Sequence, residues 1–223
     1  MSLFERLKDD CRAEWSAYVG HAFVRGLGDG TLPEAAFRRY LVQDYLFLIQ
    51  FARAYALAVY KGRDLGEMRD GLEGLKAIMD VEMGLHVRLS ARWGLTAAAL
   101  EGADEASETV AYTRFVLDAG MSGDLLDLWV ALAPCMIGYG EIGRALAPAS
   151  ADNPFRDWIE EYASDGYQDV ARASRERIDR LAPSGMGADR YGHLRRLFAT
   201  ATRLEGAFWQ MGLDATVNEE RIA

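Results

Sequence analysis

Cys135 lies in the apolar segment LWVALAPCMIGYGEIG. A free cysteine in such a segment is most often a buried space-filling residue, and composition by itself favours that interpretation. Three neighbouring features favour a reactive thiol. Pro134 should kink the helix because it cannot donate a backbone hydrogen bond. Tyr139 lies four residues further on, on the same helical face. Gly138 and Gly140 permit close approach of a ligand or a second helix. These features predict a thiol that lines a cavity.

Asp44 is a carboxylate in the otherwise apolar segment YLVQDYLFLIQFARAYA. Phe47 and Phe51 follow at the third and seventh positions, so one helical face presents a carboxylate beside aromatic rings. A buried carboxylate is unfavourable without a partner. The pattern therefore predicts either a structural carboxylate paired with an arginine or a carboxylate that binds a polar heteroaromatic ligand.

Glu205 repeats this pattern in FATATRLEGAFWQMG, with Phe208 and Trp209 one turn further along. Burial beside these rings would suit Glu205 to proton transfer, whereas an arginine-paired glutamate on a half-exposed face is the alternative. Tyrosines on several other predicted helices could stack on a flat ring, although each alone is most simply a packing residue. These tyrosines are Tyr112, Tyr162 and Tyr167.

Glu82 and His86 form an ExxxH pair, which could contribute two ligands to a metal ion. Helical di-iron proteins use ExxH instead and need it twice. The only other histidines are His21 and His193, and no ExxH pair stands out at either of them. An ion pair between Glu82 and His86 is therefore the favoured interpretation.

The elements that must position these residues are helices, because apolar residues recur at intervals of three to four almost throughout and no strand pattern is present. Glycines at positions 26, 28 and 30 predict a loop over residues 26–33. The sequence predicts one all-α domain, 1–223, of seven to eight helices with a frayed tail from about residue 214. The predicted helices span residues 2–19, 33–60, 68–93, 105–119, 123–146, 153–164, 166–181 and 190–211.

Composition excludes several classes of function. The formal net charge of -9 opposes binding to nucleic acid. The two cysteines have no CxxC spacing, which fits a reducing cytoplasm. The charged N-terminus is unlike a signal peptide, and the longest apolar run, 128–140, is shorter than the ~20 residues of a membrane span. No phosphate-binding loop, dinucleotide fingerprint or GxSxG elbow is present.

Five segments, in this order along the chain, jointly resemble the TenA family, also called thiaminase II or aminopyrimidine aminohydrolase. They are HAFVRGLGDGTLP (21–33), FRRYLVQDYLFL (37–48), ALAPCMIGYGEIG (131–143), FRDWIEEYAS (155–164) and RLEGAFWQM (203–211). The resemblance implies a heme-oxygenase-like helical bundle, a homotetramer and an active site without metal or organic cofactor. It also implies thiamin salvage, by hydrolysis of thiamin-related aminopyrimidines to hydroxymethylpyrimidine with release of ammonia or the thiazole.

The same resemblance implies a role for each candidate residue. Cys135 would be the nucleophile, Asp44 would bind the amidine edge of the pyrimidine, and Glu205 would transfer protons at the leaving group. Cys135 also places the chain in the cysteine branch of the family, since another branch uses a glutamate. The implied substrate-binding residues are Asp44, Phe47, Tyr112, Tyr139, Tyr162 and Phe208.

Phe47 departs from the family pattern, because many members have tyrosine there; the aromatic ring is retained and one hydroxyl is lost. Two other functions are compatible with the same fold. One is a heme or di-iron protein, suggested by Glu82, His86 and His21. The other is a non-catalytic binder of the thiamin pyrimidine, although a binder has no need of a nucleophile.

Overall fold

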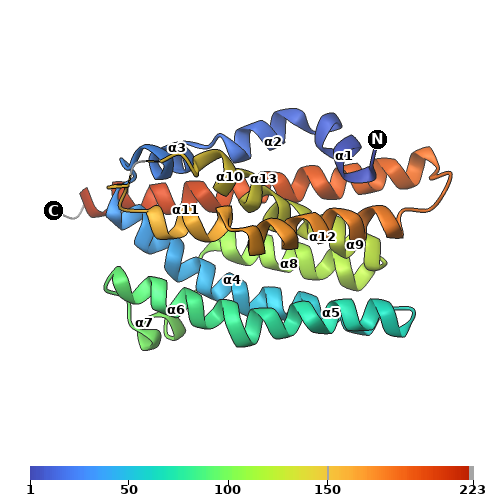
Figure 1. The fold of residues 1–223 in the computed structure, drawn as a ribbon, viewed down its shortest axis with the longest axis horizontal. Coiled ribbons are helices and arrows are strands. Elements are labelled where there is room, and N and C mark those ends of the chain that lie inside the picture. Colours follow the sequence, from blue (N-terminus) through green and yellow to red (C-terminus); the bar gives the residue numbers. More distant parts are fainter. Residues whose placement is uncertain (150, 221–223) are drawn as a thin grey trace. The chain divides into compact units, whose positions relative to one another are not determined.

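The computed structural model describes the backbone of residues 1–149 and 151–220, with side chains described up to residue 215. Throughout these ranges the chain forms helices joined by turns, and no strand is present (Figure 1). The all-α prediction is confirmed. The chain divides into two compact units, which are described in turn. Unit 1 comprises Met1–Leu32 and Leu126–Ala207, and unit 2 comprises Pro33–Leu125 and Phe208–Ala223. The single-domain organisation stays a prediction.

Unit 2 is organised around the long helix α4, against which α5, α6, α7 and α8 pack. No glycine or proline interrupts α4, which begins after Pro33 and ends at Gly62. One continuous helical run contains α5, the π-helical segment η1 and α6. The bounds are α4 Glu34–Lys61, α5 Leu65–Ala77, η1 Ile78–Glu82, α6 Met83–Arg92, α7 Ala97–Glu101 and α8 Ser107–Ser122.

Unit 1 contains the helices of the N-terminus and most of the second half of the chain. Within it α10 packs against α11, α12 and α2, and α12 also contacts α1 and η2. The bounds are α1 Leu3–Asp10, α2 Arg12–Val19, α3 Ala22–Asp29, α9 Leu125–Ala133, η2 Pro134–Gly138, α10 Tyr139–Leu146, α11 Arg156–Ala163, α12 Asp165–Leu181 and α13 Ala188–Glu220. Helix α13 passes from unit 1 into the residues of unit 2.

The run α9–η2–α10, Leu125–Leu146, is strongly apolar. At 22 residues it is longer than the apolar run seen in sequence and is long and apolar enough to cross a membrane. However, 89% of its apolar window is buried inside the protein. This stretch is therefore a buried core helix.

The described residues form thirteen α-helical and two π-helical segments, so the prediction of seven to eight helices was too low. The expected loop over residues 26–33 is wrong at its start, because α3 continues to Asp29. Gly26 and Gly28 are tolerated in α3 because their missing side chains leave room for Leu32 and Leu146. Gly30, with φ of 77°, ends the helix in the left-handed conformation that suits glycine.

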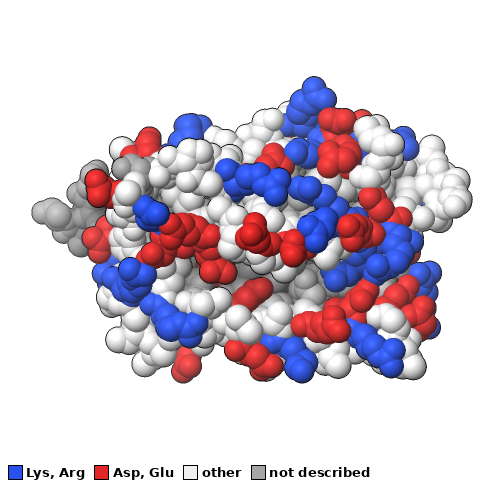
Figure 2. All heavy atoms as spheres, in the orientation of Figure 1, with Lys and Arg blue, Asp and Glu red and all other residues white. Residues whose placement is uncertain are grey.

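Other boundaries also differ from the prediction. The expected first helix is interrupted at Cys11, and α7 was not predicted. The predicted frayed tail falls partly on α13, which continues to Glu220, and partly on residues 221–223, which lie outside the described range. On the surface, acidic and basic side chains are interspersed on the face shown in Figure 2.

Candidate functional site

The eight residues predicted to act on a ligand fall into two sets, one in each unit. Each set combines at least one ionisable or nucleophilic group with aromatic rings. The set of unit 1 is Cys135, Tyr139, Tyr162 and Glu205, and the set of unit 2 is Asp44, Phe47, Tyr112 and Phe208.

Cys135 differs in exposure from the other residues of the segment 125–140. From Leu125 to Gly140, a stretch that the structure describes in full, each residue is buried except Cys135, which is half-buried. A cysteine that only filled space would be expected to share the burial of its neighbours. Cys135 is therefore the residue of this segment that is most accessible to solvent.

The expected disturbance at Pro134 takes the form of a π-helical segment, η2. Short π-helical insertions are frequent at functional sites. The carbonyl oxygen of Pro134 accepts a hydrogen bond from the Tyr18 hydroxyl at 3.2 Å, and that of Cys135 accepts one from the Tyr167 hydroxyl at 3.5 Å. A side chain on Gly138 would overlap the ring of Tyr18. These contacts hold the backbone on both sides of the thiol.

Tyr139 and Tyr162 are brought together within unit 1. Their ring centroids lie 4.9 Å apart, and both rings also contact Trp158. The side-chain amide of Gln168 donates 2.9 Å hydrogen bonds to the carbonyl oxygens of Gly140 and Tyr162. This single side chain therefore ties α10 to α11 and fixes the spacing of the two tyrosines.

Glu205 is 1% exposed. The alternative of a half-exposed face for Glu205 is therefore wrong, because α13 is packed on the side that carries this residue. Phe208 and Trp209, its neighbours one turn along α13, are 2% and 0% exposed. Burial beside aromatic residues, the local condition for a proton-transfer group, is met.

Asp44 lies on α4 in unit 2 and is 7% exposed. Its Oδ2 atom accepts a 3.0 Å hydrogen bond from the Tyr40 hydroxyl and lies 3.5 Å from Nδ1 of His86. Burial raises the pKa of Asp44 above its ordinary value, while His86 and Tyr40 oppose the rise by favouring the carboxylate. The partners of Asp44 are therefore His86 and Tyr40. The pairing with an arginine that the sequence also suggested is wrong.

The aromatic members of the unit 2 set surround Phe47. Its ring centroid lies 5.2 Å from that of Tyr112 and 6.0 Å from that of Phe208. Asp44 is one turn before Phe47 on α4. The structure thus brings together, within one unit, the carboxylate and the three aromatic residues that the sequence assigned to ligand binding.

Gln43 holds the start of α8, the helix that carries Tyr112, and was missed from sequence. It is fully buried, and its Oε1 atom accepts hydrogen bonds from the Ala106 amide at 2.8 Å and the Thr109 hydroxyl at 2.6 Å. Its Nε2 atom donates to the Asp104 carbonyl at 2.9 Å. These bonds fix the start of α8 on α4. The sequence could have indicated a structural role for Gln43, since it is a polar residue in the same apolar segment as Asp44.

His86 does not pair with Glu82. Its ring instead bridges α6 to α4, with Nε2 2.7 Å from the Leu41 carbonyl oxygen and Nδ1 facing Asp44. The favoured Glu82–His86 ion pair is therefore wrong, because tertiary packing turns the ring toward α4. Among the residues with described side chains, no three histidine, cysteine or acidic groups are placed to hold a metal ion.

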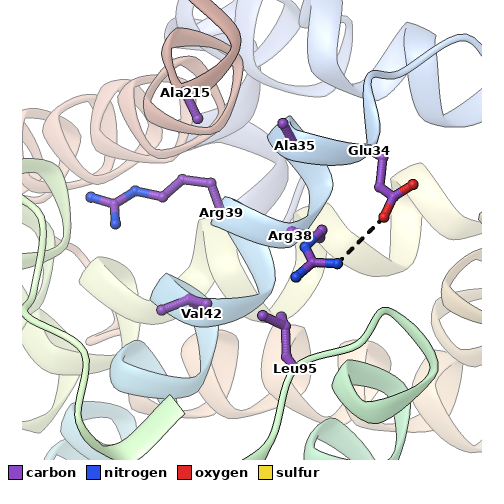
Figure 3. A pocket seen from close by; sticks show the side chains of 7 residues that line it. All are labelled: Glu34, Ala35, Arg38, Arg39, Val42, Leu95 and Ala215. Carbon is purple, nitrogen blue, oxygen red and sulfur yellow. Dashed lines mark hydrogen bonds and ion pairs between the residues drawn. The ribbon is translucent and has the colours of Figure 1, made fainter. Parts of the chain in front are cut away.

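A separate pocket of about 480 Å³ opens in unit 2 near the start of α4 (Figure 3). Arg38 lies across it and is paired with Glu34 at 3.4 Å. None of the predicted site residues lines this pocket. Its lining residues are Glu34, Ala35, Arg38, Arg39, Val42, Leu95 and Ala215.

The chain is similar to known proteins over nearly its whole length. The aminopyrimidine aminohydrolase of Halalkalibacterium halodurans is 39% identical over 214 residues, which cover 95% of each chain. The solved structure of a TenA family transcription regulator from Silicibacter sp. TM1040 is 45% identical. The two structures match with a TM-score of 0.90, and the match covers 95% of this chain and 96% of the Silicibacter chain.

The fold is also shared with a more distant protein. A domain of unknown function with a heme oxygenase-like fold from Shewanella denitrificans gives a TM-score of 0.75 at 12% identity, with 97% of this chain and 93% of that chain covered. The fold is therefore heme oxygenase-like, as predicted. Residues 8–215 match the model of the TENA/THI-4/PQQC family, which includes all eight residues of the two sets. The chain belongs to the TENA/THI-4/PQQC family.

Proposed function

We propose that the protein hydrolyses thiamin-related aminopyrimidines, converting aminomethylpyrimidine to hydroxymethylpyrimidine and ammonia, or thiamin to hydroxymethylpyrimidine and the thiazole, in thiamin salvage. The observation that carries the proposal is the partial exposure of Cys135 within the otherwise buried segment 125–140. The similarity to the aminopyrimidine aminohydrolase of Halalkalibacterium halodurans supports the same reaction class.

The chemistry assigns one role to each ionisable group. The Cys135 thiolate adds to a carbon of the pyrimidine ring and forms a C–S bond, which breaks the aromaticity of the ring. The ring electrons then expel the amine or thiazole from the methylene carbon. Water adds to that carbon, the C–S bond breaks, and the thiol is restored. The net reaction exchanges the leaving group for a hydroxyl.

Asp44 and Glu205 provide substrate binding and proton transfer, which the thiolate does not provide. Asp44 binds the amidine edge of the ring, where an amino group donates and the carboxylate accepts. Glu205 protonates the departing amine and deprotonates the incoming water. Phe47, Tyr112 and Phe208 provide the aromatic surface against which the flat ring stacks. We also assign Tyr139 and Tyr162 of unit 1 to substrate binding.

The test is a side-by-side assay of ammonia release from aminomethylpyrimidine and thiazole release from thiamin, with chelator-treated protein. We expect turnover of at least one substrate by the wild type and its loss in Cys135→Ser. Cys11→Ser is the matched control, because Cys11 is a buried cysteine outside both sets, and it should keep its activity. Absence of both activities in folded, metal-free wild type would overturn the proposal.

A non-catalytic role has one specific observation in its favour, the description of the Silicibacter relative as a transcription regulator. If the present chain were only a binder, hydroxymethylpyrimidine would bind tightly and neither substrate would be turned over. The formal net charge of -9 makes direct binding to DNA unfavourable, so hydrolysis remains the proposed function.

We also infer that the protein assembles as a homotetramer. Leu65, Met68 and Leu72 are exposed along one face of α5, at 64%, 39% and 47%. An exposed apolar row of this kind is typical of an interaction surface. Sedimentation analysis of the wild type and of Leu72→Glu tests the inference: the wild type should be tetrameric, and a monomeric wild type would contradict it.

A further inference from the structure

His86 is a buried histidine to which the proposed reaction gives no role. It is 8% exposed and spans two helices of unit 2, with contacts to α4 at both ring nitrogens. Neither contact lies on the helix that carries His86. The ring is therefore held in one orientation by the packing of α6 on α4.

The contact with Leu41 defines the proton on one nitrogen of the His86 ring. A backbone carbonyl only accepts hydrogen bonds, so the 2.7 Å contact with Leu41 requires the proton on Nε2. Nδ1 then faces Oδ2 of Asp44. A single proton is available between these two atoms, either on Nδ1 as an ion pair or on Oδ2 as a neutral pair. In both forms, the histidine and the carboxyl group are linked through Oδ2.

The second oxygen of Asp44 is left open. Both protein partners of the carboxyl group, Tyr40 and His86, contact Oδ2. Oδ1 has no partner among the side chains that the structure describes. It is also absent from the set of fully buried side-chain atoms that lack a hydrogen-bond partner, so it keeps some contact with solvent. An acceptor on a nearly buried side chain therefore remains free for a donor from outside the protein.

We propose that His86 is a positioning residue for Asp44, holding Oδ2 so that Oδ1 is presented to the amino group of an aminopyrimidine. The inference rests on the proposed function, which supplies the ligand. Tyr40 is on α4 one turn before Asp44 and cannot by itself fix the carboxyl group from a second direction. His86 approaches from α6 and provides that second direction.

Two substitutions separate the two contacts of His86. In His86→Asn the side-chain amide nitrogen lies near the position of Nδ1 and can still donate to Asp44, while the bond to Leu41 is lost. In His86→Gln the amide nitrogen reaches the position of Nε2 and keeps the bond to Leu41, while the contact with Asp44 is lost. His193→Gln is the control, because His193 also contacts an aspartate, Asp127 at 3.1 Å, but belongs to neither set.

Calorimetric titration with hydroxymethylpyrimidine is the measurement, together with the unfolding midpoint of each variant. We expect the Kd of His86→Asn to stay within about threefold of the wild type and that of His86→Gln to rise by about tenfold or more. His193→Gln should bind like the wild type. A purely structural role predicts that binding follows stability instead, so that His86→Gln, which keeps the 2.7 Å bond, is the better binder.

Equal Kd values for the two His86 variants, or tighter binding by His86→Gln, would overturn the inference and leave the proposed function intact. A wild type that neither binds the pyrimidine nor hydrolyses a substrate would overturn both. If His86→Asn does not fold, the Kd of His86→Gln alone tests the inference. An unchanged Kd in that variant would refute a positioning role for His86. Nitrogen NMR of the wild type provides an independent check, because a neutral ring protonated at Nδ1 would contradict the assignment.

Discussion

The two cysteines should differ sharply in reactivity toward iodoacetamide. Cys11 is 1% exposed, and burial, reinforced by the nearby Glu14 carboxylate, raises the pKa of its thiol from 9.0 to about 11. The thiolate is the form that is alkylated. At a pH below both values, a rise of two units lowers the thiolate fraction roughly a hundredfold. Cys135 is half-buried whereas Cys11 is buried, so Cys135 should react first.

The assay follows alkylation by peptide mass spectrometry and enzymatic turnover on the same samples. We expect one equivalent of label at Cys135 while Cys11 remains at least about a hundredfold slower, with turnover falling in proportion to label at Cys135. Bound hydroxymethylpyrimidine should slow the labelling, and Cys11→Ser should show the same time course as the wild type. Comparable rates at both cysteines would refute the burial argument, and full labelling of Cys135 with unchanged turnover would refute its role as nucleophile.

Three further substitutions test the site and the packing around it. Because burial raises the pKa of Asp44 above 3.8, the stability that Asp44 contributes relative to Asp44→Asn is present at low pH and falls as the pH rises through its folded-state pKa. Urea unfolding of both proteins from about pH 4 to about pH 7 should show this trend, and a constant difference would contradict it. Phe47→Tyr adds a hydroxyl that many family members have, and one added hydrogen bond of about 1 kcal/mol would raise kcat/KM about fivefold in steady-state assays. An unchanged or lower value would show that the hydroxyl finds no partner. Gly143→Ala should destabilise the protein by about 1–3 kcal/mol in urea unfolding, because the added carbon meets the backbone of Tyr162. The control Gly192→Ala meets only the flexible end of an arginine, and equal stabilities would argue against tight packing of α10 on α11.

Local pattern was sufficient for the helical class and for several of the candidate residues. The three-to-four spacing of apolar residues depends only on the geometry of one helix, and it placed Asp44, Cys135 and Glu205 in helices that the structure contains. The resemblance to the TenA family, which rested on motifs around these residues, was confirmed by the family match over residues 8–215. The roles of the individual residues stay predictions.

Contacts between helices could not be predicted from the local sequence pattern. Glycine propensity argued against α3, whose glycines are accommodated by Leu32 and Leu146 from outside the helix. The spacing of Glu82 and His86 suggested a local ion pair, whereas packing of α6 on α4 turned the histidine to Leu41 and Asp44.

The burial of Glu205 and the exposure of Cys135 are also tertiary properties, because a helix that is apolar in sequence does not specify which of its residues faces an opening. The sequence determined which chemical groups the protein has and on which helices they lie. The packing of those helices decided which oxygen of Asp44 is left without a partner and which cysteine solvent can reach, since desolvation and long-range hydrogen bonds depend on neighbours that are distant in the chain.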